Sequence, residues 1–452
     1  MDKESIQIGR RLVALTIPSM IDYALQSAVG YADYIMVGKL GENASAAIGL
    51  TTEVSFLLRG VLMSVGVGII SFIAIAMGRG KKEEGIKATI QAFHLSLLLG
   101  ILLMCVAICI SPFLPGWMGA DKYIRKMASD YFKISYYGML GMSFNILLGS
   151  ALKGAGNMKT PMYVNVGMNL LNICFNVLFI YESRLIEIGK IHFYLWGAGM
   201  GINGAALATS CANLIGGICM IAAVWKNAML SPRGREKKWD VFVLKKIFLV
   251  AYPVFLCRMV TSTGRIVFSS FVTRLSTISF AAHSITFTAE SAFYMPVIGA
   301  QSAVTTMSGN ITGEKNQTKL NLLTKVSCTF IGVVMFLVAL FMLCFARNVL
   351  SFFTSNEEVI ALGRILFCIV AVNEPMFAIS VVMEGIFNGM GDTKRTFFVS
   401  AMTLWLVRVL GTWIAIYFFH AGVIGAWICM ALENATRGMV LVVTYFAKNK
   451  TR

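Results

Sequence analysis

Long apolar runs constrain this chain of 452 residues more than any other feature of its sequence. About twelve such runs can be read, each long enough to cross a hydrocarbon layer of about 30 Å at about 1.5 Å per residue. They lie near residues 11–37, 52–78, 88–111, 128–150, 161–181, 197–225, 246–273, 280–309, 326–346, 359–387, 397–419 and 422–446. We therefore expect a polytopic membrane protein.

Composition decides which secondary structure these runs adopt. Hydrophobic residues make up 57% of the chain and charged residues only 13%, and the mean hydropathy is +0.74. In lipid every backbone N–H and C=O group must be bonded internally, which leaves helices or closed barrels. Barrel strands alternate polar and apolar residues, and these runs do not. The prediction is an all-α fold with about 12 transmembrane helices.

The basic residues indicate how the chain is inserted. Lys and Arg are concentrated in the tails and in alternate loops, such as RGKK (79–82) and PRGREKK (232–238). This asymmetry is the positive-inside signature, so we expect a cell-membrane protein with both termini cytoplasmic. It also accounts for the net charge of +17 without a nucleic-acid partner. The first apolar run is too long for a cleaved signal peptide, and we interpret it as a retained span.

An internal repeat divides the chain into halves. At a shift of 235 residues Pro18 matches Pro253, and KGAGNMK (153–159) falls on NGMGDTK (388–394). Six spans per half give two bundles of the same orientation, related by a pseudo-twofold axis along the membrane normal. We predict six-helix lobes at 1–225 and 246–452, joined by a cytoplasmic linker at 226–245. Paired bundles of this kind are typical of secondary transporters.

Several segments resemble one transporter family. ADYIMVGKLGENASAAIGL (32–50), ALKGAGNMKTP (151–161), NLLNICFNVLFI (169–180) and GINGAALATS (201–210) occur in the order found in the multidrug and toxic compound extrusion (MATE) family. TRLSTISFAAHSI (273–285) and FNGMGDTK (387–394) also fit in the second half. The resemblance covers nearly the whole chain and implies a twelve-helix antiporter.

Asp33 is a carboxylate inside the first apolar run. An unpaired charge there costs about 3 kcal/mol or more, so it faces a bundle interior or a wet cavity. One interpretation is an interfacial aspartate satisfied by backbone groups or by Lys39. The other is a titratable or cation-binding site, which is the chemistry that coupled transport needs.

The resemblance implies a coupling site around this aspartate. Similar MATE proteins carry an aspartate at the Asp33 position that couples export to H+ or Na+ entry. The family's pair in span 5 corresponds to Asn172 and Asn176, which share a helix face, and its hydroxyl in span 6 to Thr209. Asn176 stands where the family usually has an aspartate. This loss of charge favours H+ coupling and leaves weak Na+ binding open.

Two further positions bear on the branch of the family. The sodium-coupled branch places a glutamate in span 7 and an aspartate in span 10, and these positions hold Thr261 and Phe377 here. The chain therefore resembles the DinF-like branch more than the NorM-like one, with coupling in the first lobe.

Asp22 precedes Asp33 by eleven residues, so both project from one helix face about 16 Å apart. Two acids on one stripe can form a proton path or line a cation-attracting cavity. The alternative is an Asp22 side chain hydrogen-bonded to a neighbouring helix.

The second half has polar residues of its own within the apolar runs. Arg258 and Arg265 share a face of span 7 and suit pairing with Glu290 or Glu374 across the bundle. Such pairs are structural, whereas an unpaired glutamate is a candidate anchor for a cationic substrate. The remaining intramembrane charges are Glu384, Arg408 and Glu433.

Enzymatic and metal sites are not predicted. There is no GxxxxGK[ST] motif for ATP, and the ten cysteines lie in apolar runs without CxxC spacing. The four histidines are far apart. We expect no catalytic residue, no bound metal and no cofactor beyond the coupling ion.

The predicted function is secondary active efflux of amphipathic or cationic organic molecules in exchange for H+ or Na+. The nearest alternative is a flippase for lipid-linked precursors or polysaccharides in the same superfamily. A membrane enzyme needs a constellation of acids, histidines or metal ligands that is not found, and a channel fits the twofold repeat poorly. The expected partners are small organic substrates and membrane lipid, and the expected state is a monomer.

Overall fold

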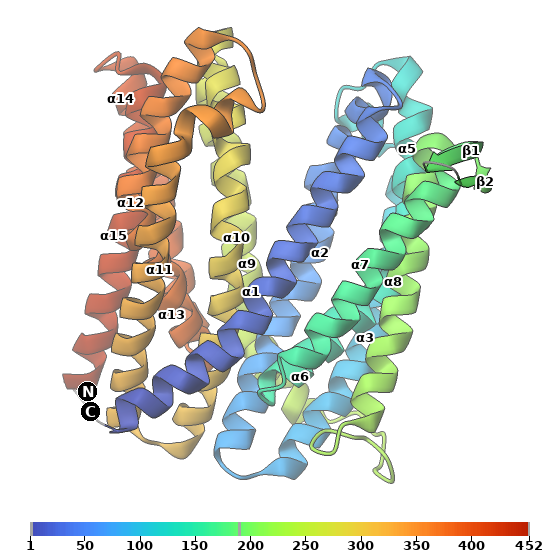
Figure 1. The fold of residues 1–452 in the computed structure, drawn as a ribbon. Coiled ribbons are helices and arrows are strands. Elements are labelled where there is room, and N and C mark those ends of the chain that lie inside the picture. The colour runs from blue at the N-terminus through green and yellow to red at the C-terminus, as the bar shows by residue number, and fades with distance from the viewer. Residues whose placement is uncertain (1–2, 189–190, 451–452) are drawn as a thin grey trace. The chain divides into compact units, whose positions relative to one another are not determined.

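The computed structural model describes residues 3–188 and 191–450, which are almost entirely helical (Figure 1). The first half contains α1 (Lys3–Gly38), α2 (Glu42–Gly78), α3 (Lys82–Ile110), α4 (Leu114–Trp117), α5 (Lys122–Tyr136), α6 (Met139–Gly154), α7 (Lys159–Phe179), β1 (Glu182–Ile188), β2 (Ile191–Ala198) and α8 (Gly201–Lys226). The second half contains α9 (Val241–Thr273), α10 (Thr277–Glu314), α11 (Gln317–Ser351), α12 (Glu357–Met390), α13 (Thr393–Met402), the π-helix η1 (Thr403–Leu410), α14 (Gly411–Tyr417) and α15 (Gly422–Lys450).

Each predicted span overlaps helix in the structure. The fourth span is divided between α5 and α6, and the eleventh runs through α13, η1 and α14. Within the described residues, nine helical segments are long and apolar enough to cross a membrane. Because lipid offers no hydrogen bonds, glycine and β-branched residues remain helical in these segments.

The chain forms two compact units. We call residues 21–73 and 81–247 the N-terminal unit, and residues 1–20, 74–80 and 248–452 the C-terminal unit. Helix α1 contributes its first part to one unit and its remainder to the other. The predicted lobe boundaries at 225 and 246 stay a prediction, because the two units are defined by packing contacts and the lobes by the sequence repeat.

Small residues bring helices together in the N-terminal unit. Helix α6 packs against both α3 and α8. A Cβ atom on Gly141 would lie 2.3 Å from the carbonyl oxygen of Asn213 in α8, so only glycine permits this approach. Close backbone packing of this kind is how membrane helices associate without a hydrophobic driving force.

The C-terminal unit has two large apolar clusters. One joins the start of α1, through Ile8 and Leu12, to residues of α10, α11, α12 and α15 such as Val304 and Phe387. The other surrounds the buried Trp427 of α15. The indole nitrogen of Trp427 donates to Nδ1 of His283 at 3.2 Å, so its polar group is satisfied.

The sequence repeat is visible in the backbone. The amide of Asn157 donates to the carbonyl of Leu152 at 2.9 Å, and the amide of Asp392 donates to that of Phe387 at 3.0 Å. These bonds close the ends of α6 and α12, with Gly156 and the equivalent Gly391 at φ values of +84° and +76°. Both pairs are related by the 235-residue shift, so the two halves end these helices in the same way.

The other glycine of the repeated motif also has equivalent surroundings. A Cβ atom on Gly154 would lie 3.0 Å from the carbonyl oxygen of Ile70, and one on Gly389 would lie 2.2 Å from that of Thr305. Ile70 and Thr305 are themselves 235 residues apart. The first glycine of GxG is therefore needed for helix packing, and the second for the left-handed turn.

Two local features were not predicted. Strands β1 and β2 pair antiparallel, with Leu185 opposite Tyr194, in a segment where no span was expected. The sequence signal was available, because short alternating runs flank the Gly-Lys dipeptide at 189–190. The eleventh span contains the π-helix η1, which a 3.6-residue periodicity does not reveal.

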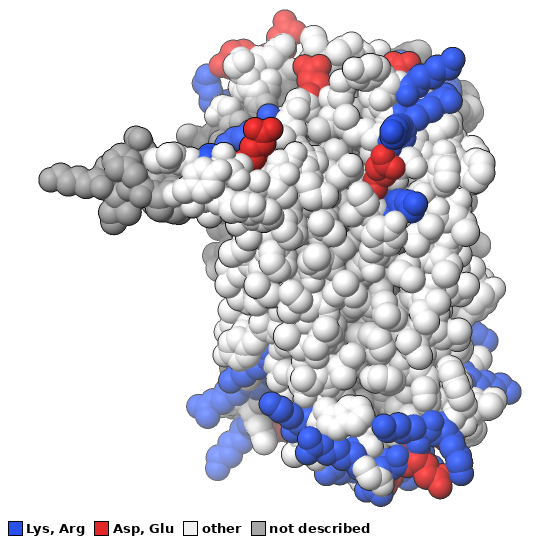
Figure 2. Space-filling view, turned by 90° about the vertical axis from the view of Figure 1, so that its right-hand side faces the viewer, with Lys and Arg blue, Asp and Glu red and all other residues white. Residues whose placement is uncertain are grey.

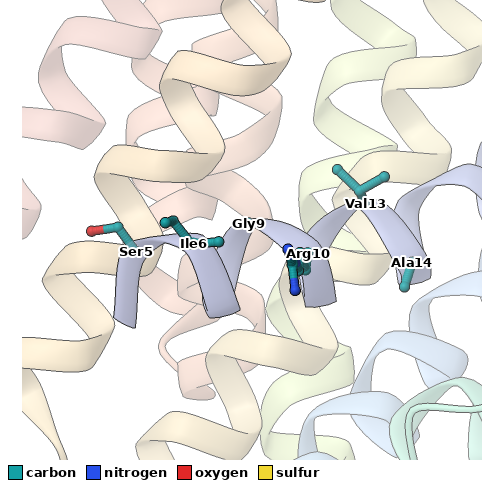
Figure 3. Close-up of a pocket in the computed structure, with 6 residues that line it drawn as sticks. All are labelled: Ser5, Ile6, Gly9, Arg10, Val13 and Ala14. Atoms are coloured by element: carbon teal, nitrogen blue, oxygen red, sulfur yellow. The ribbon is translucent and has the colours of Figure 1, made fainter. Parts of the chain in front are cut away.

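The surface agrees with insertion in lipid. The face seen in Figure 2 has its Lys, Arg, Asp and Glu residues toward two ends, with a broad uncharged band between them. A groove of 450 Å³ lies along the first turns of α1 (Figure 3), lined by Ser5, Ile6, Gly9, Arg10, Val13 and Ala14. It contains none of the predicted site residues.

Candidate functional site

The four residues predicted for coupling are brought together in the N-terminal unit. The side-chain nitrogen of Asn176 donates to Oδ1 of Asp33 at 2.5 Å and to Oδ1 of Asn172 at 3.4 Å. The nitrogen of Asn172 donates to the Thr209 hydroxyl at 3.3 Å, and that hydroxyl donates to the carbonyl of Ala205. We call Asp33, Asn172, Asn176 and Thr209 the Asp33 station. It connects α1, α7 and α8 by one chain of hydrogen bonds.

The Asp33 station contains an unused oxygen. Asn176 is 1% exposed, and its Oδ1 has no hydrogen-bond partner within the described part of the chain. A buried amide oxygen without a partner is costly, and it is a good ligand for a proton donor or a hard cation. Carboxylate, amide and hydroxyl groups are thus connected here at buried or half-buried positions.

Asp22 lies in a second polar cluster of the same unit. Its Oδ1 accepts from Asn165 and from Gln26, both at 2.9 Å, and its Oδ2 lies 3.4 Å from Nζ of Lys153. The Lys153 ammonium also lies 5.3 Å from the centre of the Tyr23 ring. We call Asp22, Gln26, Lys153 and Asn165 the Asp22 station. Asp22 therefore contacts neighbouring helices, and its role in a proton path stays a prediction.

A stripe of asparagines on α7 connects the two stations. Asn165, Asn169, Asn172 and Asn176 have the spacing i, i+4, i+7 and i+11, which places them on one face of a helix. Asn165 contacts Asp22 and Asn176 contacts Asp33, and each bond joins residues 143 apart in the sequence. The two carboxylates of α1 are thus matched by two amides of α7 with the same spacing of eleven residues.

The C-terminal unit contains a buried ion pair that sequence reasoning did not select. Nη2 of Arg408, in η1, lies 2.6 Å from Oε2 of Glu433 in α15, and the two side chains are 10% and 2% exposed. Arg437 adds a second guanidinium, 3.7 Å from the other carboxylate oxygen. Thr403 donates to that oxygen at 3.4 Å. Glu433 is therefore neutralised inside the unit.

The two predicted glutamates, Glu290 and Glu374, belong to the same unit as this pair. Glu290 is within electrostatic range of Arg408 and of Glu374. Glu374 is 1% exposed, and neither of its carboxylate oxygens has a hydrogen-bond partner among the described residues. Two neighbouring carboxylates can share a proton or face a cation.

The predicted arginines of span 7 make local contacts. Nη2 of Arg265 donates to the Ser262 hydroxyl at 3.3 Å, one turn away on α9. Nε of Arg258 has no partner in the described ranges. The ion pairs described within this part of the unit use Arg408 and Arg437.

Sequence reasoning missed the neutral and basic partners of the carboxylates. Lys153, Asn165 and Asn145, whose amide donates to Asn165 at 2.8 Å, were not singled out. A signal existed for one of them, since Asn165 precedes Asn176 by the same eleven residues that separate Asp22 from Asp33. Lys153 gave no such signal, because it lies at the end of a span where lysine is ordinary. Among the described residues no group of three or more His, Cys, Asp or Glu could hold a metal.

Comparison with known proteins identifies the class to which this fold and site belong. The model of the MatE family matches residues 18–178 and 253–414, and the two matches begin 235 residues apart. They cover more than half of the chain, and they coincide with the internal repeat. The protein is a two-repeat membrane transporter and not an enzyme.

The chain belongs to the MatE family, as the resemblance in its sequence indicated. It is 26% identical to the "Probable multidrug resistance protein NorM" of Thermotoga maritima, over 100% of this chain and 95% of that protein. It is 23% identical to the protein of the same description from Photorhabdus laumondii, over 96% and 94%. Its placement in the DinF-like branch stays a prediction.

Solved structures confirm the predicted fold. A crystal structure of MATE in complex with MaL6 superposes with a TM-score of 0.90 at 22% identity, over 100% of this chain and 99% of that one. An outward-facing multidrug resistance MATE transporter of the MOP superfamily gives the same TM-score, identity and coverage. The all-α polytopic architecture predicted from the apolar runs is correct.

Proposed function

We propose that this protein is a secondary active multidrug efflux antiporter, which exports amphipathic or cationic organic molecules in exchange for a cation that enters at Asp33. The observation that supports this most directly is the Asp33 station, in which polar side chains of three helices are connected by hydrogen bonds at buried or half-buried positions. The relatives named as multidrug resistance proteins support the substrate class.

The direction of the hydrogen bonds supports a proton as the coupling ion. An ionised Asp33 accepts the amide hydrogen of Asn176, as observed. A protonated Asp33 becomes an O–H donor and needs an acceptor, and the unused Oδ1 of Asn176 can supply it when the amide turns over. Asn172 must then turn as well and donate to Asn176.

This reversal reaches a third helix. The Oδ1 atom of a turned Asn172 faces Thr209, whose hydroxyl then donates to it and leaves the carbonyl of Ala205. A change in the protonation of Asp33 on α1 thereby changes the hydrogen bond of Thr209 on α8, through rotation of two amides. A ligand can shift a conformational equilibrium only through different affinities for the two states, and the two hydrogen-bond directions supply such a difference.

The setting of the transporter is part of the same proposal. It acts as a monomer in the plasma membrane, with both termini cytoplasmic, without a nucleic-acid partner and with no cofactor beyond the coupling ion. Sodium coupling would use the same oxygens, with Asn176 contributing no charge.

The test is uptake of a fluorescent organic cation into inside-out vesicles under an imposed pH gradient or an imposed Na+ gradient. Wild type is compared with Asp33→Asn and with Asp121→Asn, an exposed aspartate before α5 that serves as the matched control. We expect uptake driven by the pH gradient in wild type and control, with a loss of about a hundredfold in Asp33→Asn.

The other outcomes also decide the question. Uptake driven only by sodium would show that Asn176 permits a cation site and would replace the proton in the proposal. Uptake by neither gradient, with Asp33→Asn equal to wild type, would contradict the proposed function and favour the flippase alternative.

A further inference from the structure

The two stations of the N-terminal unit share one arrangement of side chains but differ in the positive partner of the carboxylate. In each, a carboxylate of α1 accepts from an asparagine of α7 that lies 143 residues later in the chain. At Asp22 the positive partner is supplied by the protein itself, as the Lys153 ammonium. In the Asp22 station the Lys153 side chain of α6 thus occupies the place that a free cation could take.

The two stations are accompanied by buried polar atoms on α7 and α6 that the described protein groups leave unused. Nδ2 of Asn169, Oδ1 of Asn176 and Oδ1 of Asn145 are buried and have no hydrogen-bond partner in the residues that the structure describes. Asn176 and Asn145 are more than nine-tenths buried. Buried polar groups are satisfied by protein, water or ions, so the two amide oxygens suit water or a cation, and the Asn169 amide N–H suits a water molecule.

We propose that the α7 asparagines form a track for the coupling cation from Asp33 to Asp22, and that Lys153 is the gate that closes the track at Asp22. This inference rests on the proposed function, because it specifies the route of the ion that enters at Asp33. A cation that reaches Asp22 must displace the lysine, so it cannot pass while the ion pair is closed.

The geometry suits a gate that opens. The contact between Lys153 and Asp22 is 3.4 Å long, and the lysine is 13% exposed while the aspartate is 1% exposed. Lys153 lies in the last turn of α6, where the helix dipole favours a positive charge, so a displaced ammonium has a second favourable position. Its long flexible side chain permits the exchange, whereas Asp22 is fixed by Gln26 and Asn165.

The experiment measures leak of the ion without any organic substrate. Purified protein is reconstituted in liposomes loaded with a pH-sensitive dye, a pH gradient is imposed, and its decay is followed. Lys153→Met is compared with wild type, and with Lys159→Met, which removes an exposed lysine from the start of α7. We expect the leak to rise about tenfold in Lys153→Met and to stay at the wild-type rate in Lys159→Met.

Further variants separate an open gate from damaged packing. Lys153→Arg retains a positive charge and should restore the low leak. The double variant Asp22→Asn with Lys153→Met removes the carboxylate that receives the cation, so its leak should return toward the wild-type rate. An equal leak in Lys153→Met and in the double variant would overturn the proposal, as would an unchanged leak in a monodisperse Lys153→Met protein.

A variant of the track itself keeps the proposal testable if Lys153→Met does not fold. Asn169→Leu interrupts the stripe without touching the hydrogen bonds of either station, and Leu170→Met at the next, exposed position is its control. We expect coupled uptake to fall about tenfold in Asn169→Leu alone. Equal uptake in the two variants would overturn the proposal that the cation passes along the α7 asparagines.

Failure of this inference and failure of the proposed function give different results. The leak assay uses no substrate, so it decides on the gate whether or not the vesicles take up organic cations. Gradient-driven uptake in wild type with no change of leak in Lys153→Met would reject the gate and leave the antiporter proposal intact.

Discussion

The two repeats place opposite chemistry at equivalent positions. In the N-terminal repeat Asp33 of α1 accepts a hydrogen bond from Asn176 of α7. The residue 235 positions after Asp33 is Phe268 of α9, and the guanidinium of Arg408 in η1 lies 5.8 Å from the centre of its ring. One repeat thus has a carboxylate beside amides at this position, where we propose that the coupling cation enters. At the equivalent position the other repeat has the apolar ring of Phe268 and, near it, the guanidinium of Arg408.

The difference shows that the repeat preserves backbone packing and not charge. The helix ends at Gly156 and Gly391 are closed by equivalent hydrogen bonds, although Asp22 is replaced by Cys257 and Lys153 by Asn388. Helix packing depends on side-chain volume and glycine positions, so polar groups can change while the fold is retained. Each repeat therefore has its own set of buried charges and its own partners for them, such as Lys153 for Asp22 and Arg408 for Glu433.

The largest expected effect concerns the buried ion pair of Arg408 and Glu433 in the C-terminal unit. Glu433→Gln leaves Arg408 buried without its counter-ion, which should lower the free energy of unfolding by about 3 to 5 kcal/mol. Thermal unfolding of the purified protein in detergent measures it. Glu374→Gln is the matched control, because that carboxylate has no hydrogen-bond partner in the described chain and its loss should be nearly neutral. Equal destabilisation of the two variants would contradict the assignment of Glu433 as the structural acid.

The next effect tests the built-in pair of the N-terminal unit. Asp22→Asn leaves the Lys153 ammonium without its carboxylate, and we expect a loss of about 3 kcal/mol, at the lower end for a buried pair because the contact is long. Asp33→Asn should change stability far less, since asparagine retains a side-chain oxygen that can accept from Asn176. The same unfolding measurement compares them. A smaller loss of unfolding free energy in Asp22→Asn than in Asp33→Asn would contradict the structural role of the Asp22–Lys153 pair.

A third prediction sharpens the difference between the repeats as cation sites. Asn176→Asp adds a second carboxylate beside Asp33, and sodium should then bind about tenfold more tightly, because affinity for hard cations rises with ligand charge. The increase of unfolding temperature with sodium concentration reports this binding. Choline chloride at matched ionic strength is the control. Identical sodium dependence in wild type and variant would show that Asn176 does not face the cation.

The smallest effect tests the far end of the hydrogen-bond chain. Thr209→Val retains the shape of the side chain and removes the hydroxyl that accepts from Asn172. Loss of one hydrogen bond of about 1 kcal/mol should slow gradient-driven uptake about fivefold. Thr261→Val, on α9 of the other repeat, is the control, because its hydroxyl bonds only the carbonyl of Arg258 among the described contacts. Equal uptake in both variants would remove Thr209 from the coupling site.

Much of this protein was determined by its sequence alone. The apolar runs predicted the spans because lipid admits only internally bonded backbone, and the 235-residue repeat matched Gly156 with Gly391, where the structure shows equivalent helix ends. Asp33 was singled out as a carboxylate inside an apolar run, and the resemblance to the MATE family implied Asn172, Asn176 and Thr209 beside it. The structure connects the four residues by hydrogen bonds, and their role in coupling stays a prediction. Each is contributed by a helix whose position in the family order could be read.

Only the tertiary structure decided which charges are neutralised and by which partners. Asp22 pairs with Lys153, which lies at a span end where lysine is common, and Arg408 pairs with Glu433, a pairing that no spacing in the sequence indicated. The pairing of Arg258 and Arg265 with Glu290 or Glu374 stays a prediction. The physical reason is that a contact between helices depends on the rotation and depth of each helix, which the π-helix η1 changes within one span. Spacing along one helix determines its faces, but the neighbour that each face meets is determined by packing.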